Sequence, residues 1–531
     1  MNISYQEKPF INQVSSWSWI LLIALSTYQF IFFWSIENTI AIEYTITAWI
    51  LTSNIFLKES NITKHPLSVF LILGFVATQF YLPLLFTTLE NKPITYNLEL
   101  PYAVFFHSFL GLIVLIIAHL IYRSLINLSS TRNNSILVKI GLFNPPTDAQ
   151  VWLMGFIGLG ATVYVYFLSP SVGWEVTGAA SDKAVQGLIP FSYAPFFIPF
   201  KDLYGGKQKP NKSLILFLAF YTVLLFVVSI GRNSRGAFML GFTSVGFAYA
   251  LGLLLGRFKP DFFTIKNAII LVVGLLVITG PIADIGTAMV IVRDQRSKVT
   301  NSELIDLTMR AFGDKKAIKL RRLEDNKDQG DWDERYLDNI FTARFANLKF
   351  NDASLVQSKK ISVQSKNMLK HSIDYILGGL PSPLLDALKI DAHKEDVYAT
   401  SIGDYLYYEA GGPIEALGGF RTGHFAGTGM AAFGWWYLLL LGVGIVPVFY
   451  LFDKLVLINY NNTVTKNTAF SLCGLLALNS VFQFLPTESV IITITFVMRK
   501  WIQMVLLYAI IYYVTLLINN IFIPKTSLNT N

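Results

Sequence analysis

The sequence predicts an all-α integral membrane protein with about twelve transmembrane helices and one large helical loop outside the cytoplasm. Three observations predict this class. Of the 531 residues, 53% are hydrophobic and only 14% are charged, whereas a soluble domain has roughly 25% charged residues. Apolar runs recur at the length of about 20 residues that a helix needs to cross a bilayer. Charged residues concentrate instead in a single segment, 293–431.

Twelve apolar runs are the expected spans. The run 188–200 is short and contains Pro190, Pro195 and Pro199, so the topology of the chain depends on whether it crosses. The first run is expected to be a span rather than a cleaved leader, because no small-residue cleavage pattern follows it. The runs lie near 17–36, 39–57, 66–86, 101–122, 151–169, 188–200, 213–230, 236–256, 267–292, 432–452, 467–486 and 500–523.

Basic residues in the short connections indicate the orientation. With the N-terminus inside, the inner connections hold 16 Lys and Arg and the outer ones hold 6, and cytoplasmic loops collect these residues. We therefore expect both termini in the cytoplasm. Residues 1–292 then form spans one to nine, 293–431 form the extracytoplasmic loop, and 432–531 form spans ten to twelve.

The net charge of +8 is also explained by the membrane topology. The loop segment 293–431 contains 20 basic and 20 acidic residues, so the basic excess of the chain lies in the remainder. This distribution is typical of a membrane protein and gives no reason to expect nucleic-acid binding.

The loop segment itself is expected to be helical. Ser302–Leu323 and Trp332–Phe350 carry apolar residues at near-helical spacing, a pattern that favours helices resting partly on the membrane. Ser372–Leu388 is apolar but is interrupted by two glycines and two prolines. We expect it to form two half-helices that dip into the interface.

Several enzyme classes are excluded by missing motifs. The sequence has no GxxxxGK[ST] phosphate loop, no HExxH motif and no dinucleotide fingerprint, so ATP-driven transport by this chain alone is not expected. Cys473 is the only cysteine, which leaves neither a disulfide nor a cysteine-built metal site. We expect no cofactor.

Four arginines are candidate anion-binding residues. Arg232 and Arg235, in VVSIGRNSRGAF, lie in a short outer turn. They are either interfacial residues that snorkel to the surface or a phosphate site beside a helix N-terminus. Arg293 and Arg296 follow the ninth span, where basic residues are also commonplace. Asp284, inside that span, needs a partner or a cavity because a buried charge is costly.

The end of the loop carries the candidate catalytic residues. In IGDYLYYEAGGPIEALGGFRTGHFAGTGMAAFGWW, His424 lies among glycines that allow close approach of a ligand. It is either a general base for a sugar hydroxyl or an ordinary loop histidine. Asp404 and Glu409 are alternative bases, or simply helix carboxylates that face water. Arg421 lies between them and His424.

These features resemble the Wzy-type O-antigen polymerases and the related O-antigen ligases. The resemblance rests on twelve spans, an SRG-type arginine turn between the seventh and eighth spans, an arginine after the ninth, and a large outer loop before the last three. FRTGHFAGTGMAAFGWW is similar to the Gly- and His-containing run with which the family re-enters the membrane, here at Gly434.

The resemblance implies a GT-C-type glycosyltransferase of the bacterial cytoplasmic (inner) membrane. Such an enzyme works without a metal and uses a polyprenyl-diphosphate-linked oligosaccharide, in contact with membrane lipid, to build O-antigen, capsule or exopolysaccharide. A flippase and a chain-length regulator are the protein partners it implies.

The resemblance also implies roles for individual residues. Arg232 or Arg235, together with Arg293, would hold the diphosphate, and His424 would activate the acceptor hydroxyl. Arg296 and Arg421 join them as substrate-binding candidates. Phe425 stands where the ligases carry Asn or a similar polar residue, which favours a polymerase over a ligase and weakens the base role of the histidine.

Other functions remain open at this point. A lipid-linked oligosaccharide flippase or a secondary transporter also has about twelve spans, and Glu43 and Asp284 within spans fit it. Carriers usually have two related halves, however, and this chain concentrates its polar residues in one outer segment. A polysaccharide acyltransferase would need a nucleophile or histidine near the cytoplasmic face, where none of the candidates lies.

Overall fold

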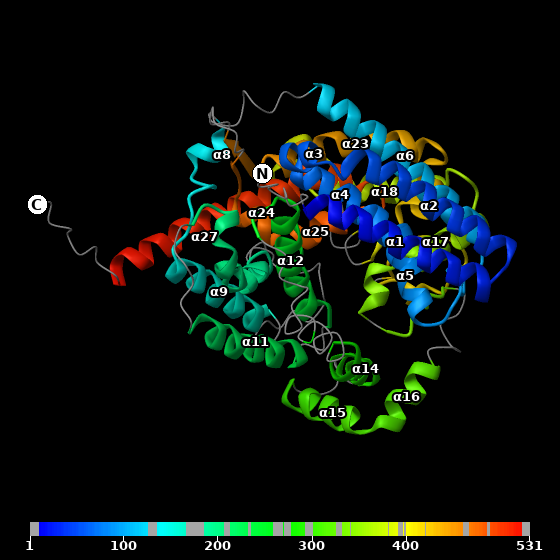
Figure 1. Cartoon of the computed structure of the whole chain (residues 1–531), viewed down its shortest axis with the longest axis horizontal. Helices are drawn as coiled ribbons and strands as arrows, with labels where there is room; N and C mark the ends of the chain where they lie inside the picture. The colour runs from blue at the N-terminus through cyan, green and yellow to red at the C-terminus, as the bar shows by residue number, and fades with distance from the viewer. Residues whose placement is uncertain are drawn as a thin grey trace, which may run out of the picture.

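A computed structural model describes most of the chain. The described residues are 10–125, 135–165, 185–206, 213–231, 235–258, 269, 278–292, 301–324, 332–339, 341–380, 382–390, 397, 400–419, 421–459, 467–485 and 489–522. Helices dominate this part of the chain (Figure 1). The described residues contain one antiparallel hairpin, in which β1 (Val456–Asn459) pairs with β2 (Asn467–Phe470).

The helices before the polar loop form the larger part of the bundle. They are α1 (Phe10–Phe32), α2 (Ile36–Phe56), α3 (Glu59–Lys64), α4 (Pro66–Val76), the π-helix η1 (Ala77–Tyr81), α5 (Leu82–Leu89), α6 (Pro101–Leu125), α8 (Ile136–Lys139), α9 (Asp148–Val163), the 3₁₀-helix η3 (Ile189–Leu203), α11 (Leu214–Gly231), α12 (Arg235–Leu254), the π-helix η4 (Ile278–Ile282) and α14 (Ala283–Ile291).

The polar loop and the C-terminal region are helical as well. Their helices are α15 (Asn301–Gly313), α16 (Lys315–Glu324), the 3₁₀-helix η6 (Thr342–Phe345), α17 (Leu348–Lys360), α18 (Lys366–Gly378), α19 (Ser382–Leu388), α21 (Ile402–Glu409), the 3₁₀-helix η7 (Ile414–Ala416), α22 (Phe425–Phe433), α23 (Trp436–Asp453), α24 (Leu472–Leu476), α25 (Leu478–Phe482), α26 (Ile492–Thr495), the π-helix η8 (Phe496–Lys500) and α27 (Trp501–Phe522).

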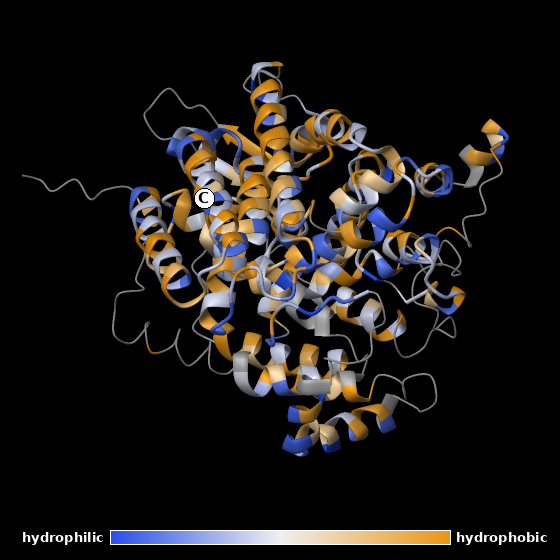
Figure 2. Ribbon diagram, turned by 90° about the vertical axis from the view of Figure 1, so that its right-hand side faces the viewer, coloured by the Kyte–Doolittle hydropathy of each residue, from blue (hydrophilic) through white to orange (hydrophobic). Residues whose placement is uncertain are grey.

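Within the described residues, five helices are long and apolar enough to cross a membrane, as in a membrane protein. Two shorter apolar helices, 214–229 and 241–254, accompany them. The five are Phe10–Phe32, Pro66–Leu89, Pro101–Leu125, Trp436–Asp453 and Ile492–Ile521. Figure 2 shows hydrophobic residues along the helices of the main body, whereas the lowest helices carry both hydrophilic and hydrophobic residues. The all-α class is therefore confirmed, and the number of twelve spans stays a prediction.

Two of the expected spans have a different local structure. Residues 189–203 form the 3₁₀-helix η3, which packs so closely on α9 that Cβ atoms added at Gly155 and Gly158 would meet Pro195 and the backbone of Ser192. Small residues permit this approach between helices. The expected span 467–486 was wrong as one continuous helix, because it is divided into β2, α24 and α25.

The polar loop is partly as expected. Helices α15 and α16 cover the expected stretch 302–323 and lie at the lower edge of the molecule (Figure 1). The stretch 372–388 is divided between two helices as expected, α18, which begins earlier at Lys366, and α19. Their dip into the membrane interface stays a prediction. The expectation of one helix over 332–350 was wrong: 332–339 is irregular, and α17 begins only at Leu348. The reason is local hydrogen bonding, since Asp333 and Asn339 accept bonds from backbone N–H groups two and three residues ahead.

A buried carboxylate connects three helices of the bundle. Oδ1 of Asp453, at the end of α23, accepts hydrogen bonds from the N–H groups of Leu67 and Ser68 at the start of α4 (3.1 and 3.2 Å). Its Oδ2 accepts from the hydroxyls of Ser68 (2.7 Å) and Tyr122 on α6 (2.9 Å). His65 Nδ1 lies 3.4 Å from the same oxygen. The group is named the Asp453 node below.

Candidate functional site

Asp404 and Arg421, two of the candidates at the end of the loop, form an ion pair. Asp404 lies on α21 and is fully buried. Its Oδ1 accepts hydrogen bonds from the backbone N–H of Arg421 (3.0 Å) and from Nη1 of the same residue (3.1 Å). Arg421 Nη1 also donates to the carbonyl of Ala416 (2.8 Å). The guanidinium is thus held in place while its side chain keeps about a quarter of its surface exposed, at 26%.

A second carboxylate, which the sequence did not indicate, lies beside this pair. Glu334 is in the irregular stretch 332–339, and its Oε1 accepts hydrogen bonds from Trp332 Nε1 (2.9 Å) and from the N–H of Thr422 (3.2 Å). Within the described part of the chain its Oε2 has no hydrogen-bond partner. Glu334, Asp404 and Arg421 are named the carboxylate–arginine cluster.

The pKa of Glu334 is raised above its ordinary value. Burial is the largest cause, because it disfavours the charged carboxylate, and the negative charge of Asp404 acts in the same direction. The hydrogen bonds from Trp332 and Thr422 and the positive charge of Arg421 oppose the shift without cancelling it. A carboxylate of this kind holds a proton more readily than one exposed to water, as a general base requires.

Local sequence explains why the two segments meet. Ser401 is the N-cap of α21: its Oγ accepts from the N–H of Asp404 (3.0 Å) and donates to the carbonyl of Arg421 (2.8 Å). A Cβ atom at Gly403 would lie 2.5 Å from the carbonyl oxygen of Arg421 and 2.7 Å from the N of Gly423. Only glycine therefore fits this crossing of α21 and the irregular segment 421–424 that leads into α22.

Aromatic rings form one wall of the cluster. The guanidinium carbon of Arg421 lies 4.8 Å from the centre of the Tyr407 ring, a cation–π geometry. Trp332 packs edge-on against the same ring at 6.0 Å. Both rings are buried, so they pack against the guanidinium and hold it in place. The guanidinium and the two carboxylates are hydrogen-bonding groups of the kind that a sugar requires.

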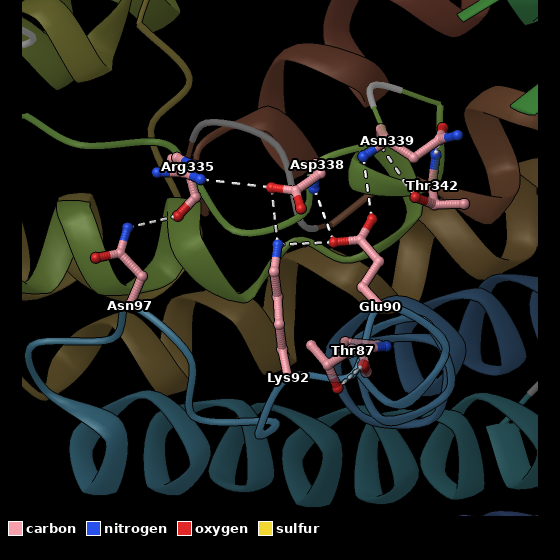
Figure 3. Close-up of polar contacts among 9 residues, drawn as sticks. Thr87, Glu90, Lys92, Asn97, Arg335, Asp338, Asn339 and Thr342 are labelled. Atoms are coloured by element: carbon pink, nitrogen blue, oxygen red, sulfur yellow. Dashed lines mark hydrogen bonds and ion pairs between the residues drawn. The ribbon is translucent and has the colours of Figure 1, made fainter. Parts of the chain in front are cut away.

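A polar network fixes the segment that carries Glu334 (Figure 3). Glu90 accepts from the N–H groups of Asp338 (2.8 Å) and Asn339 (3.0 Å). Lys92 Nζ lies 2.8 Å from both Glu90 and Asp338. Asn97 Nδ2 donates to the carbonyl of Arg335 (2.7 Å). The connection between α5 and α6 therefore holds the middle and the end of the irregular stretch 332–339.

The network continues into the interior through Lys349 and Asp352. Lys349 is 2% exposed, and its Nζ donates to Asp352 Oδ2 (2.8 Å) and to the carbonyl of Asn97 (2.6 Å). Asp352 in turn accepts from the N–H groups of Glu99 (3.1 Å) and Leu100 (2.8 Å) just before α6. This buried ion pair ties α17 to α6 and completes the support of the cluster.

His424 is part of the helix framework rather than an accessible base. It is the N-cap of α22, and its Nδ1 accepts from the N–H of Ala426 (3.4 Å). The residue is fully buried, and burial lowers its pKa to about 3, with a smaller contribution from His107. An imidazole with such a pKa is neutral at physiological pH but is a weak proton acceptor.

Helix α22 packs closely on its neighbours because glycines lie at the contacts. A Cβ atom at Gly427 would lie 2.3 Å from Ser354 on α17, and one at Gly429 would lie 2.8 Å from Tyr437. Behind this contact, Asn351 Nδ2 donates to Ser108 Oγ on α6 (3.0 Å). The glycines expected to admit a ligand beside His424 instead admit neighbouring helices.

The remaining candidates are not part of this cluster. Glu409 ends α21, where its Oε2 accepts from Asn367 Nδ2 (3.0 Å) in an exposed pair. Arg235 begins α12, but its side chain lies outside the described residues. Arg232, Arg293 and Arg296 also lie outside the described residues. The expected diphosphate site therefore stays a prediction.

Asp284 has the partner that its position required. Its Oδ2 accepts from Lys315 Nζ at 2.8 Å, and Lys315 is the first residue of α16. The Lys315 side chain is 62% exposed, so the pair lies at a polar boundary rather than in an apolar interior. This contact attaches the polar loop to α14.

The sequence could not indicate Glu334 because 88 residues separate it from Thr422. Only folding brings the two segments together. In the described part of the chain, no group of three or more His, Cys, Asp or Glu side chains is placed to hold a metal ion. Comparisons with protein-family models, curated proteins and solved structures found no match to this chain.

Proposed function

We propose that this protein is a membrane glycosyltransferase that polymerises oligosaccharide repeat units carried on polyprenyl diphosphate. In this proposal the polar loop faces the outside of the bacterial cytoplasmic membrane, both termini lie in the cytoplasm, and the spans number about twelve in a GT-C-like arrangement. The resemblance to Wzy-type polymerases motivates the proposal. The carboxylate–arginine cluster supports it with a site whose groups suit an acceptor sugar.

The single observation that carries the proposal is the state of Glu334. Its raised pKa, and an Oε2 that has no hydrogen-bond partner among the described residues, make it the best general base among the candidate residues. Asp404 is neutralised by Arg421, and His424 is buried with a pKa of about 3. We therefore assign proton acceptance to Glu334 and sugar positioning to Arg421.

The reaction balances with these groups. The acceptor hydroxyl loses its proton to Glu334, and its oxygen forms a bond to the anomeric carbon of the donor. The bond between that carbon and the diphosphate breaks, and the electron pair leaves with the diphosphate. Arg232, Arg235, Arg293 and Arg296 would stabilise this leaving group, because cationic side chains lower the energy of developing negative charge.

The test is polymerisation by the purified full-length protein. The substrate is a polyprenyl-diphosphate oligosaccharide, the products are sized, and parallel reactions contain a chelator because the resemblance implies transfer without a metal. Glu334→Gln is expected to lower the rate by at least about 100-fold, the usual contribution of a general base. Glu415→Gln, an exposed carboxylate of the same loop, is the matched control and is expected to retain activity.

The arginines are tested in the same assay. Arg235→Ala and Arg293→Ala are expected to abolish chain growth while the protein remains inserted in the membrane. Normal polysaccharide ladders from both variants would exclude the diphosphate assignment. Full activity of Glu334→Gln would exclude this residue as the base.

A deletion strain separates the proposed function from its alternatives. Loss of a polymerase leaves lipid capped with a single repeat unit. Loss of a flippase or transporter leaves no outer material, and loss of a ligase leaves polymer on the lipid carrier. Either of the last two results would replace the polymerase proposal.

A further inference from the structure

A cavity of about 640 Å³ lies at the other end of α23 from the carboxylate–arginine cluster. Its wall includes Phe452, near the end of α23, whereas α22 and the loop lie at the start of that helix. The 18 residues of α23 span about 27 Å at 1.5 Å per residue. The cavity is therefore separate from the site of the proposed function, and its volume is typical of a ligand pocket.

The interior of the cavity is mostly apolar. Aromatic and aliphatic side chains from η3, α23, α24, α26 and α27 line it, among them Phe191, Phe452 and Leu476. Cys473 and Tyr508 mark its buried end. The Tyr508 hydroxyl is buried without a hydrogen-bond partner in the described part of the chain. Such a lining favours a hydrocarbon chain.

The mouth of the cavity carries a cation. Lys500 lines the cavity, is exposed, and is the one charged side chain among the described lining residues. It ends the π-helix η8, and π-helical turns are frequent at functional sites. No ion pair of Lys500 exists among the described residues. The adjacent Trp501 fixes the helix at this level, because its Nε1 donates to the carbonyl of Leu451 (2.9 Å).

The opposite wall is held in a defined position. Asn479 on α25 accepts from Thr243 Oγ1 (2.8 Å), and its N–H donates to Ser244 Oγ (3.2 Å), both on α12. These bonds fix α25 against α12 and leave the side chains of Ser480 and Gln483 at the cavity. The cavity is thus a built feature between several helices from distant parts of the chain.

The geometry points to a lipid-binding site in which the hydrocarbon chain of an anionic lipid with a phosphate headgroup fills this cavity and Lys500 binds the phosphate. Lysine is a common phosphate ligand because it presents a compact positive charge. An anionic phospholipid and a polyprenyl phosphate share this chemistry. The inference does not depend on the proposed function.

The test measures lipid retained by the delipidated full-length protein with native mass spectrometry. Phosphatidylglycerol, phosphatidylcholine and a polyprenyl monophosphate are added separately. We expect one phosphatidylglycerol per chain to be retained, and Lys500→Gln to weaken its binding by about ten-fold, the usual contribution of a hydrogen bond to a charged group. Arg499 is a neighbouring cation that does not line the cavity. The Arg499→Gln variant is therefore expected to bind phosphatidylglycerol as tightly as the unmodified protein does.

A second variant tests the cavity itself. Ser480→Trp fills the exposed mouth and is expected to reduce retention of every chain-bearing lipid, whatever its head. If the protein retains the polyprenyl monophosphate through Lys500 but does not retain phosphatidylglycerol, the ligand of the site is the isoprenoid carrier. The site would be overturned if neither substitution changed the retention of phosphatidylglycerol. It would also be overturned if phosphatidylcholine were retained as well as phosphatidylglycerol.

Discussion

Asp404 and Asp453 are both fully buried carboxylates, yet their surroundings differ. Both oxygens of Asp453 accept hydrogen bonds from backbone N–H groups and hydroxyls of α4 and α6. Asp404 is paired with the partly exposed guanidinium of Arg421, beside Glu334, which has an unpartnered oxygen in the described part of the chain. The Asp453 node is saturated and holds helices together. The carboxylate–arginine cluster keeps capacity to bind a ligand.

The largest expected effect breaks the saturated node. Asp453→Ala leaves several buried donors without an acceptor, at a cost of about 1–3 kcal/mol each. We expect the free energy of unfolding to fall by roughly 3 kcal/mol or more. Thermal unfolding of the purified variant and of the unmodified protein measures this loss of stability.

The matched control for this variant is Asp314→Ala. Asp314 is an exposed carboxylate whose Oδ1 accepts from the N–H groups of Lys316 and Ala317 at the start of α16. Its loss is expected to cost about 1 kcal/mol, as for other helix N-caps. Equal effects of the two substitutions would contradict the structural role given to the Asp453 node.

The next effect tests the support of the cluster. Lys349→Met removes a buried ammonium, so that within the described part of the chain the Asp352 carboxylate keeps only its two backbone donors. A loss of about 2–3 kcal/mol follows, somewhat less than for breaking a fully dependent buried pair. Lys366→Met, at an exposed position of α18, should change stability by no more than about 0.5 kcal/mol. Chemical denaturation would compare them.

A smaller effect separates the two roles of His424. His424→Ala removes the cap of α22 and is expected to cost about 1 kcal/mol. His424→Asn keeps a capping acceptor and should retain both stability and polymerisation. A folded Asn variant with no activity would show instead that the imidazole takes part in the reaction.

The smallest effect concerns pH. Because the folded-state pKa of Glu334 is raised above 4.5, the folded protein binds this proton more tightly than the unfolded chain does. The resulting contribution to stability is complete below the unfolded pKa and is lost as pH rises through the folded pKa. Glu334→Gln should remove this part of the pH dependence of the unfolding temperature, and Glu415→Gln should preserve it.

The catalytic consequence has the opposite sign. Glu334 accepts a proton only when ionised, so the polymerisation rate should rise with pH through the folded pKa of this group. A rate profile without this rise would leave the cluster as a purely structural contact, like the Asp453 node.

Much of the architecture could be predicted from the sequence because hydrophobicity acts locally. Span-length runs such as 101–122 became single helices, and the breaks in 372–388 became the gap between α18 and α19. Prediction failed where side chains compete with helical hydrogen bonds. The irregular stretch before α17 depends on Asp333 and Asn339, and their effect cannot be read from apolar spacing alone.

The sequence by itself determined a helical membrane protein with a polar loop, and it identified Asp404 and Arg421 as residues of interest. Composition and periodicity suffice for this because burial in lipid and helix formation depend on neighbouring residues. Only the tertiary structure decided that Glu334 joins them, that His424 is buried, and that Lys500 opens on a cavity. These properties depend on segments far apart in the chain, whose approach is set by packing.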